Sequence, residues 1–299
     1  MADDPERYSL SPERLQHIYE SRIAPDLFRS AQPVERPTAV VLGGQPGAGK
    51  TPMQNLASRE FADKGGIVKI IGDDLRAHLP HYKALQRSDD KTAAFFTDRD
   101  SGRLVEKAIA EAAQRSINVL VEGTMRDPDV VQATLERFRR AGFQTDARAL
   151  AVNPEMSALG ILQRYAAQRE SRGIGRMTTW EAHEHALKGM LRTLDRIQDQ
   201  RLADTLTIYR RGGEIIHRFD FAVPSKGDEP RARELVERER TRPFTPQEAD
   251  YKRREIERLT PKLREYGIMP APNVERDQAR PDPDRAGPSG RDRDADRDR

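Results

Sequence analysis

The sequence predicts an α/β protein in which a mainly parallel sheet is the middle layer of a three-layer sandwich. Two patterns predict it: short apolar segments alternate with segments of helical periodicity, and a glycine-rich loop joins the first pair. The expected strands are 39–42, 67–71, 119–121, 147–152 and 206–209. The expected helices are 50–62, 101–116, 128–141, 154–172 and 179–199. Strands connected in this way pair in parallel and bind ligands at their carboxyl ends.

The loop after the first expected strand carries the clearest chemical signal. It reads Gly-Gln-Pro-Gly-Ala-Gly-Lys-Thr and fits the phosphate-binding loop (P-loop) pattern G-x-x-x-x-G-K-[ST] at every defined position. Its glycines let successive backbone N–H groups surround a phosphate chain, and the N-terminus of the following helix adds partial positive charge. In this pattern the lysine reaches the β- and γ-phosphates and the hydroxyl binds Mg²⁺. We therefore expect a P-loop NTPase fold that binds ATP and Mg²⁺ through Gly44, Gln45, Pro46, Gly47, Ala48, Gly49, Lys50 and Thr51, with Thr51 on the metal.

Carboxylates follow the next two expected strands. Asp73 lies just past the second strand, where it could accept a proton from an attacking hydroxyl or simply cap a helix. Glu122 ends the third strand, in the place of a Walker-B carboxylate or of an ordinary strand-ending turn. The spacing alone leaves both pairs of alternatives open.

Composition excludes several classes of function. The chain of 299 residues has 52 basic and 49 acidic side chains, a formal net charge of +3. This near-balance neither demands nor excludes a nucleic-acid partner, and we do not expect one. The chain has no cysteine, which excludes disulfides and thiolate chemistry. His183 and His185 are two residues apart and face different sides of a helix, so we expect no metal site there. No signal peptide or membrane-spanning segment is apparent, and we expect a cytoplasmic protein.

The distribution of charge and hydrophobicity predicts four regions. They are an N-terminal helical extension (1–36), a P-loop domain (37–222), a charged helical region (229–267) and a disordered tail (270–299). The first of them should contain a helix that begins at Ser11 and docks an apolar stripe on the core.

Beyond the loop, an ordered series of short segments resembles the zeta toxin family. The segments are GGQPGAGKT (43–51), GDDLR (72–76), PHY (80–82) and VEGTMR (121–126). The resemblance extends over residues 34–217. It implies a P-loop kinase of a bacterial toxin–antitoxin system, which uses ATP to phosphorylate a hydroxyl of UDP-N-acetylglucosamine and so blocks cell-wall synthesis.

The same resemblance implies roles for individual residues. Asp73 corresponds to the catalytic base and Lys50 to the lysine of the phosphate loop, while Arg164 and Arg176 correspond to arginines that grip the phosphates. The arginines belong to a segment, about 153–178, that could close as a lid on Gly173 and Gly175. Residues expected to contact the acceptor are Arg76, His81, Glu106, Glu122, Thr124, Arg126 and Thr134.

Two other functions remain open from the sequence. A related kinase could phosphorylate another small-molecule or nucleotide acceptor, and a nucleotide-dependent switch would bind or hydrolyse ATP without any acceptor. The family resemblance also implies a small antitoxin partner that occludes the ATP site. The N-terminal helix and the charged region 229–267 are candidate docking surfaces for it.

Overall fold

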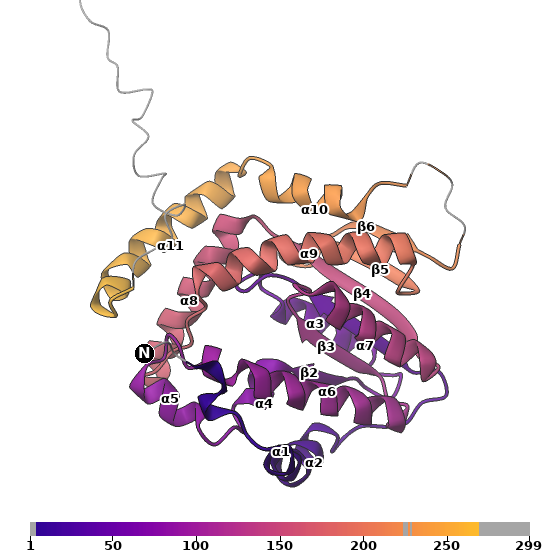
Figure 1. Cartoon of the computed structure of the whole chain (residues 1–299). Helices are drawn as coiled ribbons and strands as arrows, with labels where there is room; N and C mark the ends of the chain where they lie inside the picture. Colours follow the sequence, from indigo (N-terminus) through magenta and orange to yellow (C-terminus); the bar gives the residue numbers. More distant parts are fainter. Residues whose placement is uncertain (1–3, 224–226, 228, 269–299) are drawn as a thin grey trace, which may run out of the picture.

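The computed structural model describes residues 4–223, 227 and 229–268 (Figure 1). The predicted disordered tail, 270–299, lies outside these residues. A single six-stranded sheet crosses the molecule. Its strands are β1 (Thr38–Gly43), β2 (Val68–Ile71), β3 (Val119–Gly123), β4 (Gln144–Ala151), β5 (Thr205–Arg210) and β6 (Ile215–Asp220).

The sheet is mainly parallel, as the sequence predicts. Its strand order is β2-β3-β1-β4-β5-β6, and every neighbouring pair is parallel except β5 and β6. Strand β6 was not predicted, because Phe219 is its only fully buried side chain and the remainder resembles a polar loop. In the parallel part, Gly43 of β1 is opposite Gly123 of β3, so both strands end at one edge.

Helices cover both faces of the sheet, which confirms the α/β prediction. The N-terminal segments are η1 (Pro5–Tyr8), α1 (Pro12–Ile18), η2 (Tyr19–Ile23) and α2 (Ala24–Leu27). The helices between strands are α3 (Thr51–Glu60), α4 (Gly72–Arg76), α5 (Tyr82–Ser88), η3 (Phe95–Thr97), α6 (Asp98–Arg115), α7 (Pro128–Arg140), α8 (Pro154–Arg172) and α9 (Trp180–Gln200). The C-terminal helices are α10 (Ala232–Thr241) and α11 (Pro246–Glu265). The short helices α4, η3 and α5 are too brief for a periodic pattern and were not predicted.

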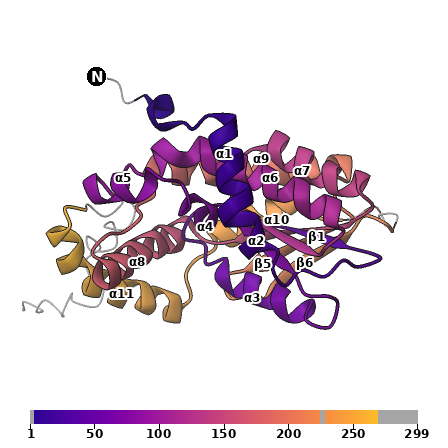
Figure 2. The same cartoon turned by 90° about the horizontal axis from the view of Figure 1, so that it is seen from below.

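Alternate residues of the central strands direct their side chains to opposite faces. Val40 and Leu42 of β1 pack against α3, whereas Val41 of the same strand packs against α7 and α9. Figure 2 shows α3 on one side of the sheet and α6, α7 and α9 on the other. Within the described part of the chain, no helix has the length and hydrophobicity that would let it span a bilayer.

The N-terminal helix begins where the sequence predicts. The Ser11 hydroxyl accepts a hydrogen bond from the Arg14 N–H and caps α1. Leu15, Ile18 and Ile23 are buried in the same cluster as α6 and the β2–β3 edge. Their apolar stripe is therefore part of the core and is not a free docking surface.

The charged region 229–267 folds back on the main body. Helices α10 and α11 run along the outside of α9 and α8 (Figure 1). Leu259 and Leu263 of α11 are buried with Leu162 and Tyr165 of α8. The apolar spacing predicted in this region thus supports α8 from its outer side.

The phosphate loop approaches α8 closely through two glycines. A Cβ atom on Gly47 would overlap the carbonyl oxygen of Ser157, and one on Gly160 would overlap the carbonyl oxygen of Gly47. Gly47 also has a φ of 77°, a left-handed conformation that favours glycine. The loop and the first turns of α8 therefore fit together only without side chains at these positions.

We predict that Gly160→Ala destabilises the fold by about 1–3 kcal/mol, because its methyl group meets backbone and forces an overpacked contact. The measurement is the midpoint and slope of urea-induced unfolding. Gly102→Ala is the matched control: it lies in α6 with open space around it, and alanine should add up to about 1 kcal/mol there. Equal stabilities for the two variants would contradict the close approach.

Candidate active site

The phosphate loop has the conformation that its sequence predicts. It leaves β1, passes through Gly47 and Gly49 with φ angles of 77° and 81°, and enters α3 at Thr51. The Lys50 Nζ donates a hydrogen bond to the Gly44 carbonyl at 3.0 Å, so the lysine folds back across the loop. Thr51, the predicted Mg²⁺ ligand, is exposed in the first turn of α3.

The strand order brings the loop and the two carboxylates together. Strands β2, β3 and β1 are neighbours, and at their carboxyl ends lie Asp73, Glu122 and the loop, respectively. The Lys50 Nζ lies 3.7 Å from Glu122 Oε1, and the Gln54 amide of α3 donates to Glu122 Oε2. Glu122 thus contacts both the phosphate-loop lysine and the following helix, which favours a role in the site over an ordinary strand-ending turn.

Asp73 does not cap a helix. The N-cap of α4 is Ile71, whose side chain makes no capping hydrogen bond, and Asp73 lies inside the first turn. Its Oδ1 accepts a hydrogen bond from Arg176 Nη1, and the two side chains form an ion pair. The structure therefore discards the cap alternative and leaves the carboxylate beside a predicted phosphate-gripping arginine.

Three cations meet at this edge of the sheet. Burial lowers the pKa of Lys50; the Glu122 charge opposes this shift, and the charges of Arg164 and Arg176 add to it. Burial also lowers the pKa of Arg164, and it lowers that of Arg176 to about 10, which leaves Arg176 charged near pH 7. The Arg164 Nη2 donates to Thr178 Oγ1 at 3.0 Å, and its buried Nε has no partner among the described residues. An anion is the group that would satisfy this cluster.

Most of the predicted lid is regular helix. Residues 154–172 form α8, and only 173–179, here called the strap, lie between helices α8 and α9. Gly173 ends α8 with a φ of 71°, but Gly175 is packed against the Tyr165 ring and leaves no room for a Cβ. That the segment closes over the site stays a prediction.

A buried aspartate that the sequence did not single out holds the strap. Asp90 is 6% exposed and accepts hydrogen bonds from the Gly175 N–H at 2.7 Å, the Tyr165 hydroxyl at 3.0 Å and Arg169 Nη1 at 3.2 Å. Burial and the Asp90 bond raise the pKa of Tyr165 to about 12, so its hydroxyl stays a donor. Asp90 therefore fixes the residue directly before Arg176. The contacts span 75–85 positions of sequence, and no local pattern reveals them.

The residues predicted to contact the acceptor substrate fall into two groups, and the first group lies near the carboxyl edge of the sheet. Arg76 and Arg126 both contact Asp98, at 3.0 and 2.9 Å, and Asp98 was not predicted. Burial alone would raise the pKa of Asp98, but the charges and hydrogen bonds of Arg76 and Arg126 outweigh it and lower the pKa. Arg76 is buried and also donates to the Ala94 carbonyl, so its side chain holds the segment before α6.

The second group is used elsewhere or is open to solvent. Glu106 is half exposed and lies 3.7 Å from Arg137, and the Thr134 hydroxyl donates to the Val130 carbonyl of its own helix. Thr124 is half-buried in the segment after β3, and His81 is exposed with its ring 5.9 Å from that of Tyr8. None of these four side chains forms a hydrogen bond or ion pair with Asp73 in the described part of the chain.

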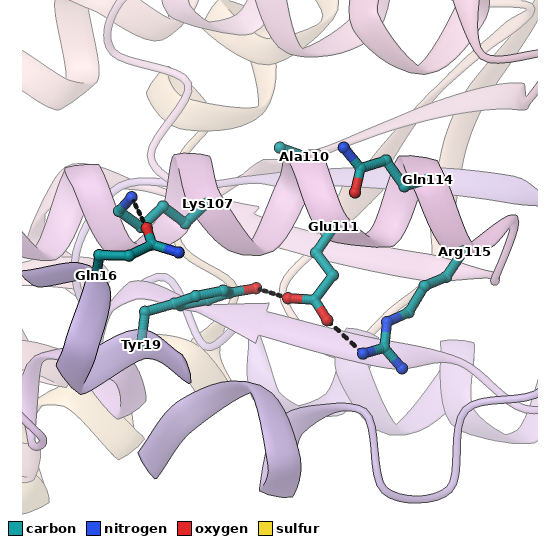
Figure 3. Close-up of a pocket in the computed structure, with 7 residues that line it drawn as sticks. All are labelled: Gln16, Tyr19, Lys107, Ala110, Glu111, Gln114 and Arg115. Atoms are coloured by element: carbon teal, nitrogen blue, oxygen red, sulfur yellow. Dashed lines mark hydrogen bonds and ion pairs between the residues drawn. The ribbon is translucent and has the colours of Figure 1, made fainter. Parts of the chain in front are cut away.

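A cavity of about 430 Å³ lies elsewhere, between the N-terminal helix and α6 (Figure 3). Several of its polar side chains contact one another: the Tyr19 hydroxyl donates to Glu111 Oε2 at 2.5 Å, and Arg115 also contacts Glu111. No residue predicted from the sequence for the active site lines it. We therefore place the candidate active site at the carboxyl edge of the sheet and not in this cavity.

Loss of the Asp90 carboxylate should release the strap. We predict that Asp90→Ala raises amide hydrogen exchange at 174–177 at least about tenfold, because hydrogen bonds to a buried charged group contribute ~1.5–3 kcal/mol. Mass spectrometry of deuterated peptides measures it. Asp89→Ala is the control, since the Asp89 side chain hydrogen-bonds to the adjoining turn, at Lys91 and Thr92. Equal exchange in both variants would show that the turn, and not the Asp90 carboxylate, holds the strap.

Known proteins agree with the family resemblance. The family model described as "Zeta toxin" matches residues 21–219. Toxin PezT of Streptococcus pneumoniae is 30% identical over 192 residues, which cover 64% of this chain and 75% of that protein. Toxin zeta of Enterococcus hirae is 27% identical, covering 77% and 80%. A solved chain from the PezAT toxin–antitoxin system of S. pneumoniae superimposes with a TM-score of 0.72 at 25% identity, covering 86% of this chain and 99% of the other. The chain therefore belongs to the zeta toxin family.

Proposed function

We propose that this protein is a kinase that transfers the γ-phosphate of ATP to a hydroxyl of UDP-N-acetylglucosamine. The observation that carries the proposal is the contact of Asp73 with Arg176 beside Lys50 of the phosphate loop. This arrangement combines a proton acceptor with positive charge at the place where phosphate would lie. Phosphoryl transfer needs these two things and little covalent help.

The residues present fit ATP. The glycine-rich loop supplies backbone N–H donors, and the buried Arg164 Nε is a donor without a partner in the described residues that a phosphate oxygen would satisfy. For Mg²⁺ the chain offers the exposed Thr51 hydroxyl, and the described residues contain no group of three or more acidic or histidine ligands. The ion would thus be held mainly by Thr51 and the phosphates.

The chain's own residues then divide the work. Asp73 accepts the proton of the acceptor hydroxyl, whose oxygen attacks the γ-phosphorus of bound ATP while ADP leaves. Lys50, Arg164 and Arg176 stabilise the negative charge on the transferring group. Arg176 contacts Asp73 Oδ1 and therefore links the base to the phosphate side of the site.

The acceptor follows from the family and is supported by the polar edge beside Asp73. Glu122, Thr124 and Arg126 come from the end of β3 and the segment after it, where donors and acceptors for a nucleotide-sugar are available. A cytoplasmic kinase of this kind would consume a precursor of the cell wall and be toxic.

The test is transfer from labelled ATP to a panel of acceptors: UDP-N-acetylglucosamine, nucleotides, aminoglycosides and no acceptor. We predict that Asp73→Asn lowers transfer to UDP-N-acetylglucosamine by about 10²–10⁴-fold, the usual contribution of a general base, while ATP affinity stays close to wild type. Lys50→Ala should weaken both ATP binding and turnover.

Asp74→Asn is the matched control, because Asp74 is the exposed neighbour of Asp73 in α4. It should retain near-wild-type transfer. Wild-type transfer by Asp73→Asn would refute the role of Asp73 as the general base. Phosphorylation of a different acceptor would change the substrate only, and ATP hydrolysis independent of acceptor would favour a nucleotide switch.

We also propose a small antitoxin partner that covers the ATP site, since the similar S. pneumoniae chain comes from a toxin–antitoxin system. The three cations of the site make an acidic segment of that partner the expected occupant. If so, the complex with the protein encoded beside this chain should bind Mg·ATP at least about tenfold more weakly than the toxin alone. Calorimetry on both samples measures this, and equal affinities would place any antitoxin elsewhere.

A further inference from the structure

A buried arginine from the C-terminal region reaches the back of the phosphate loop. Arg240, near the end of α10, is 7% exposed, and its Nη2 donates to Gln45 Oε1 at 3.2 Å. Its Nη1 donates to the Leu187 carbonyl of α9 at 2.9 Å. Arg240 lies beyond residues 21–219, the part of the chain that matches the family model.

Gln45 is the loop residue that receives this contact, and its side chain is fully buried. Its Nε2 donates to the Val152 carbonyl at 2.7 Å and to Ser157 Oγ at 3.3 Å. The Val152 carbonyl can only accept a hydrogen bond and the Arg240 guanidinium can only donate one. One orientation of the Gln45 amide therefore satisfies both. Gln45 therefore faces the protein and anchors the loop to the end of β4, to α8 and to α10.

Arg240 forms no ion pair in the described part of the chain, although the charge of Glu237, on the same helix, acts on it and opposes the effect of burial. The adjoining carboxylate, Glu239, is instead bonded to Arg210 and Arg242, at 3.1 and 2.8 Å. Burial lowers the pKa of Arg240 to about 10, which leaves it charged near pH 7. Burial also lowers the pKa of His183; the Glu184 charge opposes this, and the Arg240 charge adds to it.

A buried cation that lacks an ion pair is costly, and its presence needs an explanation. The phosphates of a nucleotide on the other side of the loop would supply the negative charge that the distant Glu237 does not bring into contact with Arg240. Attraction through the low-dielectric interior falls slowly with distance, so contact is not required.

We propose that Arg240 is a positioning residue of the donor-phosphate site: it locks the phosphate loop through Gln45 and places positive charge behind it. The C-terminal helix α10 is then a working part of ATP binding, and the charged region is not only a scaffold. This inference rests on the proposed ATP site, but not on the identity of the acceptor.

The test is Mg·ATP affinity by calorimetry, at low and at physiological salt, together with KM and kcat. Arg240→Gln should weaken ATP binding about tenfold or more and raise KM for ATP more than it lowers kcat. Arg240→Lys keeps the charge but loses the contact geometry, so it should recover part of the affinity. Gln45→Leu combined with Arg240→Gln should be less than additive, because the two residues form one contact.

Two controls separate positioning from stability. Arg238→Gln removes an exposed charge from the same helix and should leave ATP affinity unchanged. Val236→Ala truncates a fully buried side chain of α10 in the apolar core, so it should lower Tm without lowering ATP affinity at a temperature where the variant is folded. If Arg240→Gln does not fold, Arg240→Lys and Gln45→Leu carry the test.

The outcomes are distinct from those of the proposed function. Unchanged ATP affinity in the Arg240 variants, or a loss equal to that of Val236→Ala at the same loss of Tm, overturns the inference even if UDP-N-acetylglucosamine is phosphorylated. A selective loss of affinity supports it even if the acceptor proves to be another molecule.

Discussion

The crowding of Lys50, Arg164 and Arg176 at one edge of the sheet is the constraint on which the remaining site depends. Like charges at short range repel one another, and burial strengthens the repulsion because the interior screens poorly. Glu122 pairs with Lys50 and Asp73 pairs with Arg176. Among the described residues Arg164 forms no ion pair: it donates to the neutral Thr178 hydroxyl, and the Glu122 charge acts on it from a distance. Three cations against two carboxylates leave an excess of positive charge, and a triphosphate is the ligand that would remove it.

Two independent parts of the fold hold that cluster against its repulsion. The parallel register of β2, β3 and β1 places Asp73 and Glu122 beside the loop. The arginines come from α8 and the strap, which are held from behind by α11 and by the Asp90 carboxylate. Helix α11 thus contributes to the stability of the site, since without it α8 would expose Leu162 and Tyr165.

Sequence patterns predicted what is local and periodic. The buried strands, the long helices and the phosphate loop follow from alternation, spacing and glycine positions, and their boundaries agree within a few residues. The polar edge strand β6 was missed, because a strand with one buried side chain has little hydrophobic pattern. Arg164 and Arg176 were distinguished from the other basic residues by family resemblance alone. Asp90 and Arg240 were missed because burial gives them their roles, and burial is decided by contacts far along the chain.

Gln45 shows why the phosphate-loop motif predicts the ligand but does not predict which residues hold the loop in place. The defined positions of the motif, the glycines, Lys50 and Thr51, are those whose chemistry faces phosphate. Gln45 occupies an undefined position, and its side chain faces the protein, where it meets Arg240 and Ser157. An undefined position can therefore differ between relatives without changing the chemistry, provided that the structure behind the loop changes with it. In this chain the structure behind the loop includes a buried charge, so the support and the attraction for phosphate come from one residue.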